Sequence, residues 1–156
     1  MIEIRAARPH EAGEMSGLAL RSKAYWGYSK DFLDACKAEL TVDPARLGTN
    51  RYAHFVCCDN SSILGFYGLA KLSTDEYELD ALFVDPTYIG TGVGRALIQH
   101  AIGTAAKFGA ARLIIQGDPN ATDFYVAAGA KQIGERESGS IPGRFLPVFE
   151  IELEAD

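Results

Sequence analysis

Leu82-Phe83-Val84-Asp85-Pro86-Thr87-Tyr88-Ile89-Gly90-Thr91-Gly92-Val93-Gly94-Arg95-Ala96-Leu97 is the stretch that decides how the sequence is organised. It begins as an apolar strand, passes through a turn with three glycines at alternate positions and continues as an amphipathic helix. The first amide groups of a helix have no partner within the helix, and glycines allow an anion to approach them. The pattern therefore predicts an anion-binding loop between a strand and a helix.

Arg95 narrows the kind of anion. A cation in the first helical turn opposes the helix dipole, and this small cost makes sense if a pyrophosphate neutralises both. A P-loop is disfavoured because Gly-Lys followed by Ser or Thr is missing. A dinucleotide fingerprint requires GxGxxG near the start of a βαβ unit, whereas these glycines form GxGxG in the middle of the chain. The alternative is a glycine-rich turn without a ligand.

The elements on either side of this loop follow from the spacing of apolar residues. Strands are expected at residues 2–7, 52–58, 63–72, 77–84, 112–116, 131–135 and 145–153, of which 131–135 is the weaker candidate. Helices are expected at residues 10–23, 29–40, 93–108 and 121–128, with Gly109 and Gly129 ending the last two, and residues 59–62 are expected to form a hairpin turn. This order predicts an α/β fold in which one mixed sheet carries helices on its faces and residues 1–156 form a single domain.

The composition limits the class of protein. The 156 residues are enough for one domain with a hydrophobic core, and 47% of them are hydrophobic and 23% charged, as in soluble globular proteins. Fifteen Lys and Arg against 21 Asp and Glu give a net charge of −6, which argues against general binding to nucleic acid or to an anionic membrane. The first residues do not read as a signal peptide and no long apolar run follows, so we expect a cytoplasmic protein.

The cysteines and histidines indicate neither a disulfide framework nor a metal site. Two of the three cysteines are neighbours in an apolar run, and all three are expected to be buried, reduced thiols. His10, His54 and His100 are dispersed along the chain, and each is expected to be a hydrogen-bonded core residue or a surface residue. No metal is expected.

At the glycine loop the sequence resembles the GNAT superfamily of N-acetyltransferases, whose acetyl-CoA motif is Gln or Arg, two residues, Gly, one residue, and Gly or Ala. Residues 89–94 match both glycines of the motif, and Ile89 replaces the usual Gln or Arg. Residues 118–130 resemble a later motif of the family, in which a Phe-Tyr pair on a short helix, here Phe124 and Tyr125, is soon followed by a glycine. The resemblance covers nearly the whole chain.

The resemblance implies a GNAT-like fold: a central mixed, mostly antiparallel twisted sheet of about six to seven strands, flanked by about four helices. It also implies that acetyl-CoA binds at the loop and leaves as coenzyme A. The residues assigned to the cofactor in this way are Leu82, Phe83, Val84, Ile89, Gly90, Thr91, Gly92, Val93, Gly94, Arg95, Asn120 and Tyr125. Asn120 has an alternative role as a helix N-cap.

Acetyl transfer to an amine requires a base, a polarised thioester carbonyl and a proton for the departing thiolate. Glu78 and Asp80 are the candidate bases, because in an alternating strand they share one face with Leu82 and Val84, and the family often places its base there. Glu78 is favoured for its reach and for a water relay, whereas the alternative is a pair of solvent-exposed acids. The resemblance assigns Tyr125 as the acid that hydrogen-bonds the sulfur, with a core tyrosine as the alternative. It also assigns the thioester carbonyl to a backbone N–H near the end of the same strand.

Two irregular segments are candidates for binding the acceptor. Tyr25, Trp26 and Tyr28 lie between the first two helices, in a region that often roofs the acceptor pocket of the family. They are able to cage an amine by cation–π contact or simply to pack the helix pair. Arg144, in the loop before the last strand, is able to pair with a substrate carboxylate or to remain a solvated loop residue.

The sequence therefore predicts an enzyme that transfers acetyl from acetyl-CoA to a primary amine of a small molecule, an amino acid or a protein, by direct attack in a ternary complex. An acyl group other than acetyl is left open. The alternative from another class is a non-catalytic acyl-CoA-binding module that regulates a partner. A transferase acting on aminoacyl-tRNA is disfavoured by the negative charge. A homodimer is also considered, because dimers are common in the resembled family.

Overall fold

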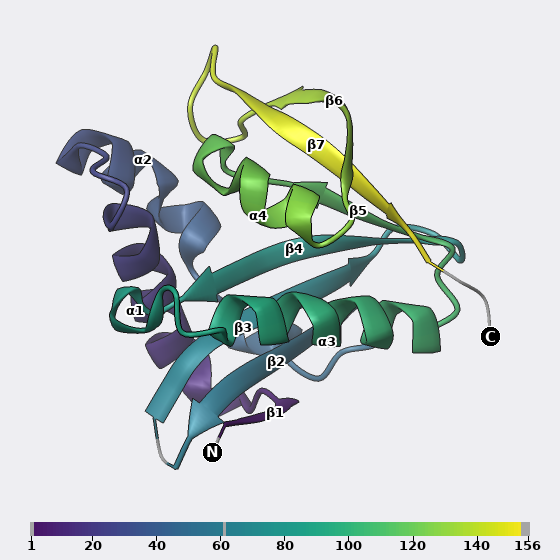
Figure 1. Ribbon diagram of the computed structural model, residues 1–156. Coiled ribbons are helices and arrows are strands. Elements are labelled where there is room, and N and C mark those ends of the chain that lie inside the picture. Colours follow the sequence, from purple (N-terminus) through teal and green to yellow (C-terminus); the bar gives the residue numbers. More distant parts are fainter. Residues whose placement is uncertain (1, 61, 154–156) are drawn as a thin grey trace.

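The computed structural model describes residues 2–60 and 62–153, which form seven strands and four α-helices (Figure 1). The strands are β1 (Glu3–Ala6), β2 (Tyr52–Asp59), β3 (Ser62–Lys71), β4 (Glu76–Val84), β5 (Arg112–Gln116), β6 (Lys131–Glu137) and β7 (Phe145–Glu152). The helices are α1 (Ala12–Ala24), α2 (Lys30–Leu40), α3 (Val93–Lys107) and α4 (Thr122–Ala127). Each element overlaps the range expected from the sequence.

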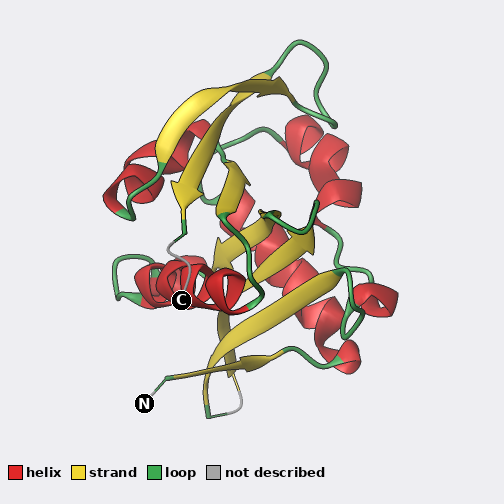
Figure 2. Cartoon of the chain, turned by 90° about the vertical axis from the view of Figure 1, so that its right-hand side faces the viewer, coloured by secondary structure: helices red, strands yellow, loops and turns green. Residues whose placement is uncertain are grey.

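The seven strands form one sheet in the order β1-β2-β3-β4-β5-β7-β6. Neighbouring strands are antiparallel except β4 and β5, which run parallel because α3 carries the chain back between them. Figure 2 shows helices on both sides of this sheet. The predicted fold, a mixed and mostly antiparallel sheet with helices on its faces, is confirmed.

Two apolar clusters hold the helices to opposite faces of the sheet. One contains Leu97 of α3 together with Tyr67 of β3, and the other contains Leu18 of α1 and Cys36 of α2 together with Phe66 of β3. Successive strand residues point to opposite faces, so the neighbours Phe66 and Tyr67 serve one cluster each. None of the helices within the described residues is long and apolar enough to cross a membrane.

β4 contains a bulge at Asp80. Leu79 of β4 pairs with Leu69 of β3. The next pair joins Ala81 to Gly68, so Asp80 is an extra residue in β4. A bulge of this kind changes the direction of the side chains that follow it.

The bulge reverses the alternation of faces within β4. Leu79 packs in the cluster on the α3 side, and so do Leu82 and Val84. Glu78, the neighbour of Leu79, therefore faces the α1 and α2 side. The expectation that Glu78 and Asp80 share a face with Leu82 and Val84 is wrong, because a period of two holds only in a strand without an inserted residue.

β4 also leaves β5 at this point. The two strands pair only over Glu76–Leu79 of β4 and Arg112–Ile115 of β5. Beyond Leu79, the edge of β4 on the β5 side has no strand partner within the described residues. Residues 79–84 instead line a cavity.

The turns have the conformations that their residues predict. Gly109 (φ +88°) and Gly129 (φ +100°) end their helices in the left-handed region. The hairpin between β2 and β3 has the expected position, with Asp59 opposite Ser62. Ser61, which was expected in this turn, lies outside the described residues.

Candidate active site

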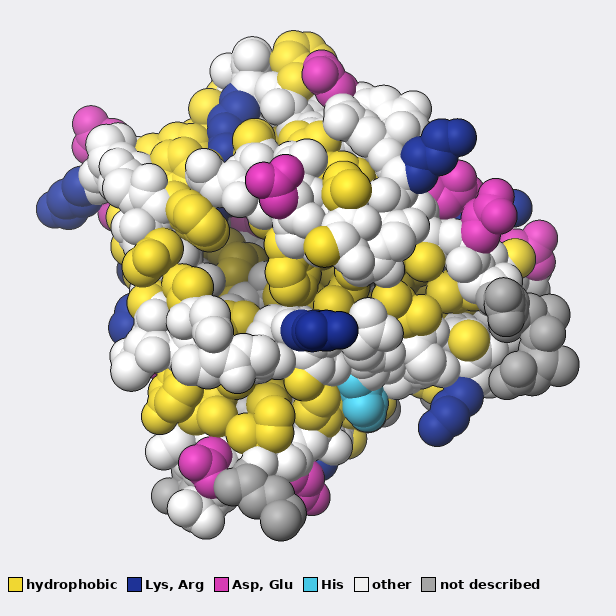
Figure 3. All heavy atoms as spheres, viewed as in Figure 1, with side chains coloured by type: hydrophobic (Ala, Val, Ile, Leu, Met, Phe, Trp, Pro, Cys, Tyr) yellow, Lys and Arg dark blue, Asp and Glu magenta, His cyan; other side chains and the backbone are white. Residues whose placement is uncertain are grey.

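A cavity of about 510 Å³ opens where β4 and β5 diverge. Its walls come from β4, the start of α3, the segment from β5 to α4, and the helices α1 and α2. In the space-filling view it is the hollow above the loop that leads into α3, and hydrophobic side chains surround it (Figure 3). The predicted cofactor residues line the cavity, except Thr91 and Val93. Of the other predicted site residues, Asp80, Trp26 and Arg144 line it, and Glu78, Tyr25 and Tyr28 do not.

The glycine loop forms one wall of this cavity. Gly90 (φ +81°) and Gly92 (φ +95°) adopt backbone conformations that L side chains rarely accept. Gly94 instead lies in the first turn of α3, where an added Cβ would come within 3.2 Å of the Phe124 ring. Two of the glycines therefore shape the loop, and the third lets α4 pack against α3.

The first turn of α3 presents unpaired amide groups. Gly92 precedes the helix without a side-chain cap, and Ala96 makes the first helical hydrogen bond, to the Gly92 carbonyl at 3.0 Å. The amides of residues 92–95 donate to no other group of the described chain. Arg95 is exposed in the same turn and lines the cavity. Unpaired amides beside a guanidinium are suited to bind an anion.

Asp85 ties this loop to α1. Its carboxylate accepts hydrogen bonds from the Thr87 amide and from Arg21 Nη2, both at 3.0 Å. Partial burial acts to raise the pKa of Asp85, but these hydrogen bonds outweigh it and lower the pKa. The carboxylate is therefore charged at neutral pH and holds the loop in place.

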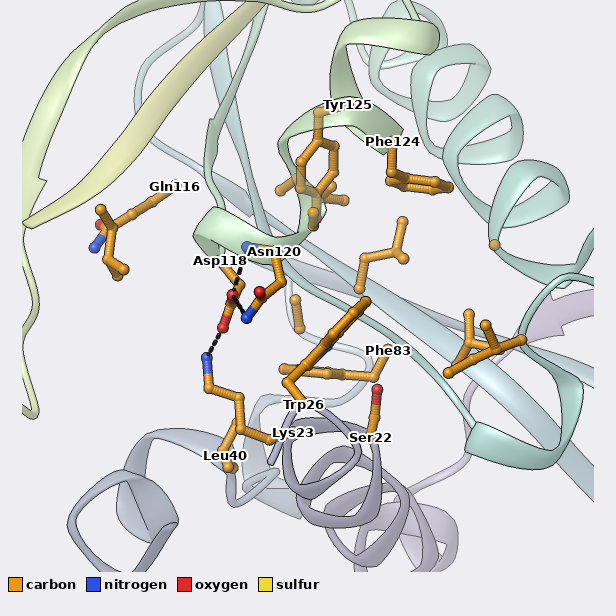
Figure 4. A pocket seen from close by; sticks show the side chains of 18 of the residues that line it. Ser22, Lys23, Trp26, Leu40, Phe83, Gln116, Asp118, Asn120, Phe124 and Tyr125 are labelled. Carbon is orange, nitrogen blue, oxygen red and sulfur yellow. Dashed lines mark hydrogen bonds and ion pairs between the residues drawn. The ribbon is translucent and has the colours of Figure 1, made fainter. Parts of the chain in front are cut away.

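Tyr125 extends from α4 into the cavity (Figure 4). The residue is 6% exposed, and its ring packs on Phe149 with the ring centroids 5.7 Å apart. A Cβ on Gly117 would stand 2.9 Å from the ring, so this glycine leaves the space for it. The hydroxyl bonds to no described residue. Burial, with the charge of Asp118 adding to it, raises the pKa of Tyr125, so the phenol is protonated at neutral pH and free to donate.

The two candidate bases occupy different positions. Asp80, in the bulge, lines the cavity. Glu78 lies outside it, where its Oε2 accepts a hydrogen bond from Arg136 Nη1 at 3.2 Å. The same Arg136 nitrogen donates to Oε1 of Gln116 at 3.2 Å, and Gln116 lines the cavity. Glu78 is thus connected to the cavity through two other side chains.

A polar network centred on Asp118 joins α1, the α1–α2 loop, the β5–α4 segment and the β6–β7 loop. Asp118 Oδ2 lies 2.5 Å from Lys23 Nζ, a contact visible in Figure 4, and 3.7 Å from Arg144 Nη2. Tyr28 Oη donates to Asp118 Oδ2 at 2.9 Å. It also accepts hydrogen bonds from Asn120 and Arg144, both at 2.9 Å. Burial acts to raise the pKa of Asp118, but Lys23 and the Asn120 amide outweigh it and lower the pKa.

Asp118 also caps the helical turn that follows it. Its Oδ1 accepts a hydrogen bond from the Asn120 amide at 2.9 Å, and α4 begins after Ala121 without a side-chain cap. The expectation of Asn120 as an N-cap is therefore wrong, because its side-chain nitrogen bonds to Tyr28 and Asp118 instead. The missed signal was Asp118-Pro119, since Asp accepts a bond from two residues on and Pro fits the first helical position.

The three aromatic residues between α1 and α2 do not form a common cage. Trp26 lines the cavity, whereas Tyr25 is 53% exposed and its ring lies nearly perpendicular to that of Trp26, with the ring centroids 5.3 Å apart. Tyr28 faces the protein's own cations, with Lys23 Nζ 5.2 Å and Arg144 Cζ 5.3 Å from its ring centroid. Of the two alternatives, these contacts favour packing within the protein for Tyr28, and neither Tyr25 nor Tyr28 lines the cavity. Arg144, with its side chain 19% exposed, is not a solvated loop residue either.

Comparisons with known proteins agree with this geometry. The sequence profile of the Acetyltransferase (GNAT) family matches residues 18–130. The chain belongs to this family. It is 32% identical over 156 residues to the peptidyl-lysine N-acetyltransferase YjaB of Salmonella typhimurium, with 97% of each protein covered. It is also 32% identical to an uncharacterized N-acetyltransferase of Mycobacterium tuberculosis, over 64% of the chain and 62% of that protein.

Solved GNAT structures share the fold. The PaiA N-acetyltransferase from Thermoplasma acidophilum, in complex with coenzyme A, matches 97% of the chain and 99% of its own with a TM-score of 0.78 at 19% identity. The ribosomal-protein-S18-alanine N-acetyltransferase of Escherichia coli has a TM-score of 0.74 at 21% identity and covers 100% of the chain and 96% of its own. The family profile and the YjaB relationship together make the chain an acyltransferase enzyme of the GNAT family.

One histidine of this GNAT chain departs from expectation. His10 is exposed, and His100 Nδ1 lies 2.6 Å from Tyr67 Oη, as expected of a surface and a hydrogen-bonded histidine. His54 is 9% exposed, and its Nδ1 is buried without a hydrogen-bond partner in the described chain. The expectation for His54 is therefore wrong, and no local pattern around it signals this.

Proposed function

We propose that this GNAT enzyme transfers an acetyl group from acetyl-CoA to a primary amine, which attacks directly in a ternary complex. The observation that carries the proposal is that unpaired amides of the glycine loop, the unpaired edge of β4 and the Tyr125 hydroxyl surround one cavity. Acetyl-CoA supplies a phosphate-bearing handle and an activated thioester when bound. The coenzyme A complex of PaiA supports the same choice.

The chain offers groups for both ends of this ligand. The amides of residues 92–95 and the Arg95 guanidinium are suited to the pyrophosphate. Ile89, 41% exposed, has no polar side-chain atom, so the loop binds mainly through its main chain. At residues 82–84, β4 has separated from β5, and its edge on that side has no strand partner in the described chain. This main chain is suited to the pantetheine amides, and Asn120 lines the same cavity.

The reaction needs two proton transfers, and the cavity has a group for each. Tyr125, kept protonated by burial, is assigned to the departing sulfur. Asp80 lines the cavity and is assigned to the amine side, as base or through water. Glu78 acts one step behind it, through Arg136 and Gln116. A β4 amide on the free edge polarises the thioester carbonyl.

The relatives support the choice of acceptor. YjaB of Salmonella typhimurium is a peptidyl-lysine N-acetyltransferase and aligns with 97% of the chain. We therefore place the amino group of a protein lysine first among acceptors, and a small-molecule amine second.

Titration with acetyl-CoA, followed by assay of free thiol with a panel of amines, tests this function. We expect the purified protein to bind acetyl-CoA and to release coenzyme A only when an acceptor amine is present. A protein that does not bind acetyl-CoA contradicts the proposal. Binding without thiol release from any amine supports the regulatory acyl-CoA-binding module instead.

A further inference from the structure

A second cavity, of about 540 Å³, lies between α2 and the sheet. Residues 38–43, at the end of α2 and just beyond, form one side, and residues of β2, β3 and β4 form the other. The residues that it shares with the acetyl-CoA cavity are Glu39, Leu40, Asp80, Ala81 and Phe83. The two cavities therefore adjoin at the bulge of β4, next to the carboxylate assigned to the amine.

His54 lines this second cavity and lacks a partner. Its Nδ1 is the only fully buried side-chain nitrogen or oxygen of the described residues without a hydrogen bond. The His54 ring lies over Gly68 of β3. A Cβ added to Gly68 would stand 2.8 Å from Cδ2 and from Nε2 of His54. Leaving a buried polar atom unpaired costs about 1–3 kcal/mol, so a histidine in this place calls for a functional reason.

The charges around His54 favour a cation. Asp80 of β4, Glu39 of α2, and Asp43 and Arg46 between α2 and β2 line the same cavity. Three carboxylates against one guanidinium attract an ammonium group and repel a carboxylate. Burial lowers the pKa of His54, although Asp80 acts to raise it, so the imidazole is neutral at pH 7 and its ring is able to take a proton.

We propose that the acceptor reaches the acetyl group through this second cavity, as a primary ammonium on an unbranched alkyl chain, and that His54 beside Asp80 takes the proton it releases. The inference rests on the proposed function. The ammonium first loses one proton to solvent, which leaves its nitrogen with a lone pair. As the bond from the amine nitrogen to the acetyl carbon forms, a second N–H bond breaks and its proton passes to His54, whose charge Asp80 balances. The C–S bond then breaks, and the sulfur keeps the electron pair and receives the proton of Tyr125. His54 returns its proton to solvent, from which Tyr125 regains one.

The choice of acceptor tests the cavity. Thiol release is measured with a lysine-containing peptide whose N-terminus is blocked, with 1,4-diaminobutane and with free glycine. We expect glycine, which carries a carboxylate beside its amine, to have a kcat/KM at least about tenfold below the better of the other two. A preference for the peptide identifies a protein lysine as the source of the ammonium, and a preference for the diamine identifies a free amine. Glycine as the best acceptor overturns the proposal.

His54→Gln tests the proton transfer. We expect kcat to fall about 100-fold while acetyl-CoA affinity is unchanged. The wild-type kcat/KM should also show a decline as the pH falls below about 6.5 that the variant lacks, because protonation of His54 removes the base. His100→Gln, on the α3 side, is the matched control and keeps the wild-type pH profile.

Gly68→Ala gives an independent test, because the added Cβ displaces the His54 ring while His54 and Asp80 themselves are not replaced. We expect a loss of kcat in the wild-type background and none beyond that of His54→Gln in the double variant. Gly134→Ala, whose Cβ meets nothing within 4 Å, is its control. If wild type acetylates amines while His54→Gln and Gly68→Ala both keep its kcat and pH profile, the role of His54 is wrong and the proposed function stands. If wild type does not bind acetyl-CoA, the proposed function itself is wrong.

Discussion

The acetyl-CoA cavity has one wall of main chain and one wall of side chains. On the first, glycines with φ of +81° and +95° lead into a helical turn whose amides are unpaired. On the second, Lys23, Asp118 and Arg144 come from three segments and are joined by ion pairs. Tyr28, which does not line the cavity, is hydrogen-bonded to Asp118 and Arg144. A main-chain wall recognises groups common to every acyl-CoA, because amides are the same whatever the sequence. Under the proposed function, the side-chain wall is the part of the cavity suited to distinguish different acceptors.

Gly92→Val breaks the main-chain wall and has the largest expected effect. Valine reaches a φ of +95° only at a cost of about 1–2 kcal/mol, and its side chain stands where an anion approaches the amides. We expect acetyl-CoA affinity to fall about 1,000-fold, measured by calorimetric titration. Gly103→Ala, in the helix α3 that follows Gly92 and with nothing within 4 Å of its Cβ, should bind as wild type. Unchanged affinity in Gly92→Val would mean that the pyrophosphate binds elsewhere.

Tyr125→Phe acts where the two walls meet. Removing the phenol leaves the departing sulfur without its proton donor, so we expect kcat to fall about 100-fold with little change in acetyl-CoA affinity. Because the pKa of Tyr125 is raised, ionisation of this phenol does not limit the wild-type rate below pH 10. Steady-state kinetics measure both kcat and its dependence on acetyl-CoA concentration. Tyr67→Phe, which removes a buried hydroxyl bonded to Thr104 at 3.0 Å, should lose stability and keep kcat. Equal kcat in wild type and Tyr125→Phe excludes Tyr125 as the acid.

Asp118→Asn breaks the side-chain wall. It leaves Lys23 and Arg144, whose side chains are 14% and 19% exposed, without their anion, so we expect the free energy of unfolding to fall by about 2 kcal/mol at pH 7. The pKa of Asp118 is lowered in the folded state, so its contribution is present above the ordinary value near 3.8 and is lost as the pH falls through the folded value. Urea unfolding should therefore show wild type and variant converging in acid. Asp123→Asn, on exposed α4 surface, is the control and should change stability little.

Asp80→Asn and Glu78→Gln have the smallest expected effects. They compare a carboxylate that lines the cavity with one that does not. Asp80 lines the cavity and Glu78 does not, so we expect kcat/KM to fall about tenfold for Asp80→Asn and less than about threefold for Glu78→Gln. The acid-side decline of kcat/KM should move to lower pH for Asp80→Asn alone, because Asp80 acts to raise the pKa of His54. The reverse ranking would make Glu78 the base, as its reach suggests from the sequence.

Much of the fold could be predicted because its signals are local. Ser29 was expected to start a helix, and its hydroxyl accepts a hydrogen bond from the Phe32 amide at 3.1 Å. Gly109 and Gly129 were expected to end helices and do so with positive φ. The sequence of the glycine loop likewise indicated unpaired amides. Each of these features depends on a few consecutive residues.

The side-chain wall could not be predicted in the same way. Tyr28 bonds to Asp118, 90 residues later, and to Arg144, 116 residues later. Nothing in the segment around Tyr28 distinguishes a residue held in such a network from one that cages a ligand. The face of Glu78 was missed for a related reason, because the bulge at Asp80 is visible only in the pairing with β3.

The sequence by itself determined the order of elements, the glycine loop at the start of a helix and the family resemblance, because helix ends, glycine conformations and strand periodicity are set by neighbours along the chain. Only the tertiary structure decided that Asp80 rather than Glu78 lines the cavity, and that His54 is buried without a partner beside a second cavity. One inserted residue changes the face of a side chain, and the surroundings of a buried group come from strands and helices distant in sequence.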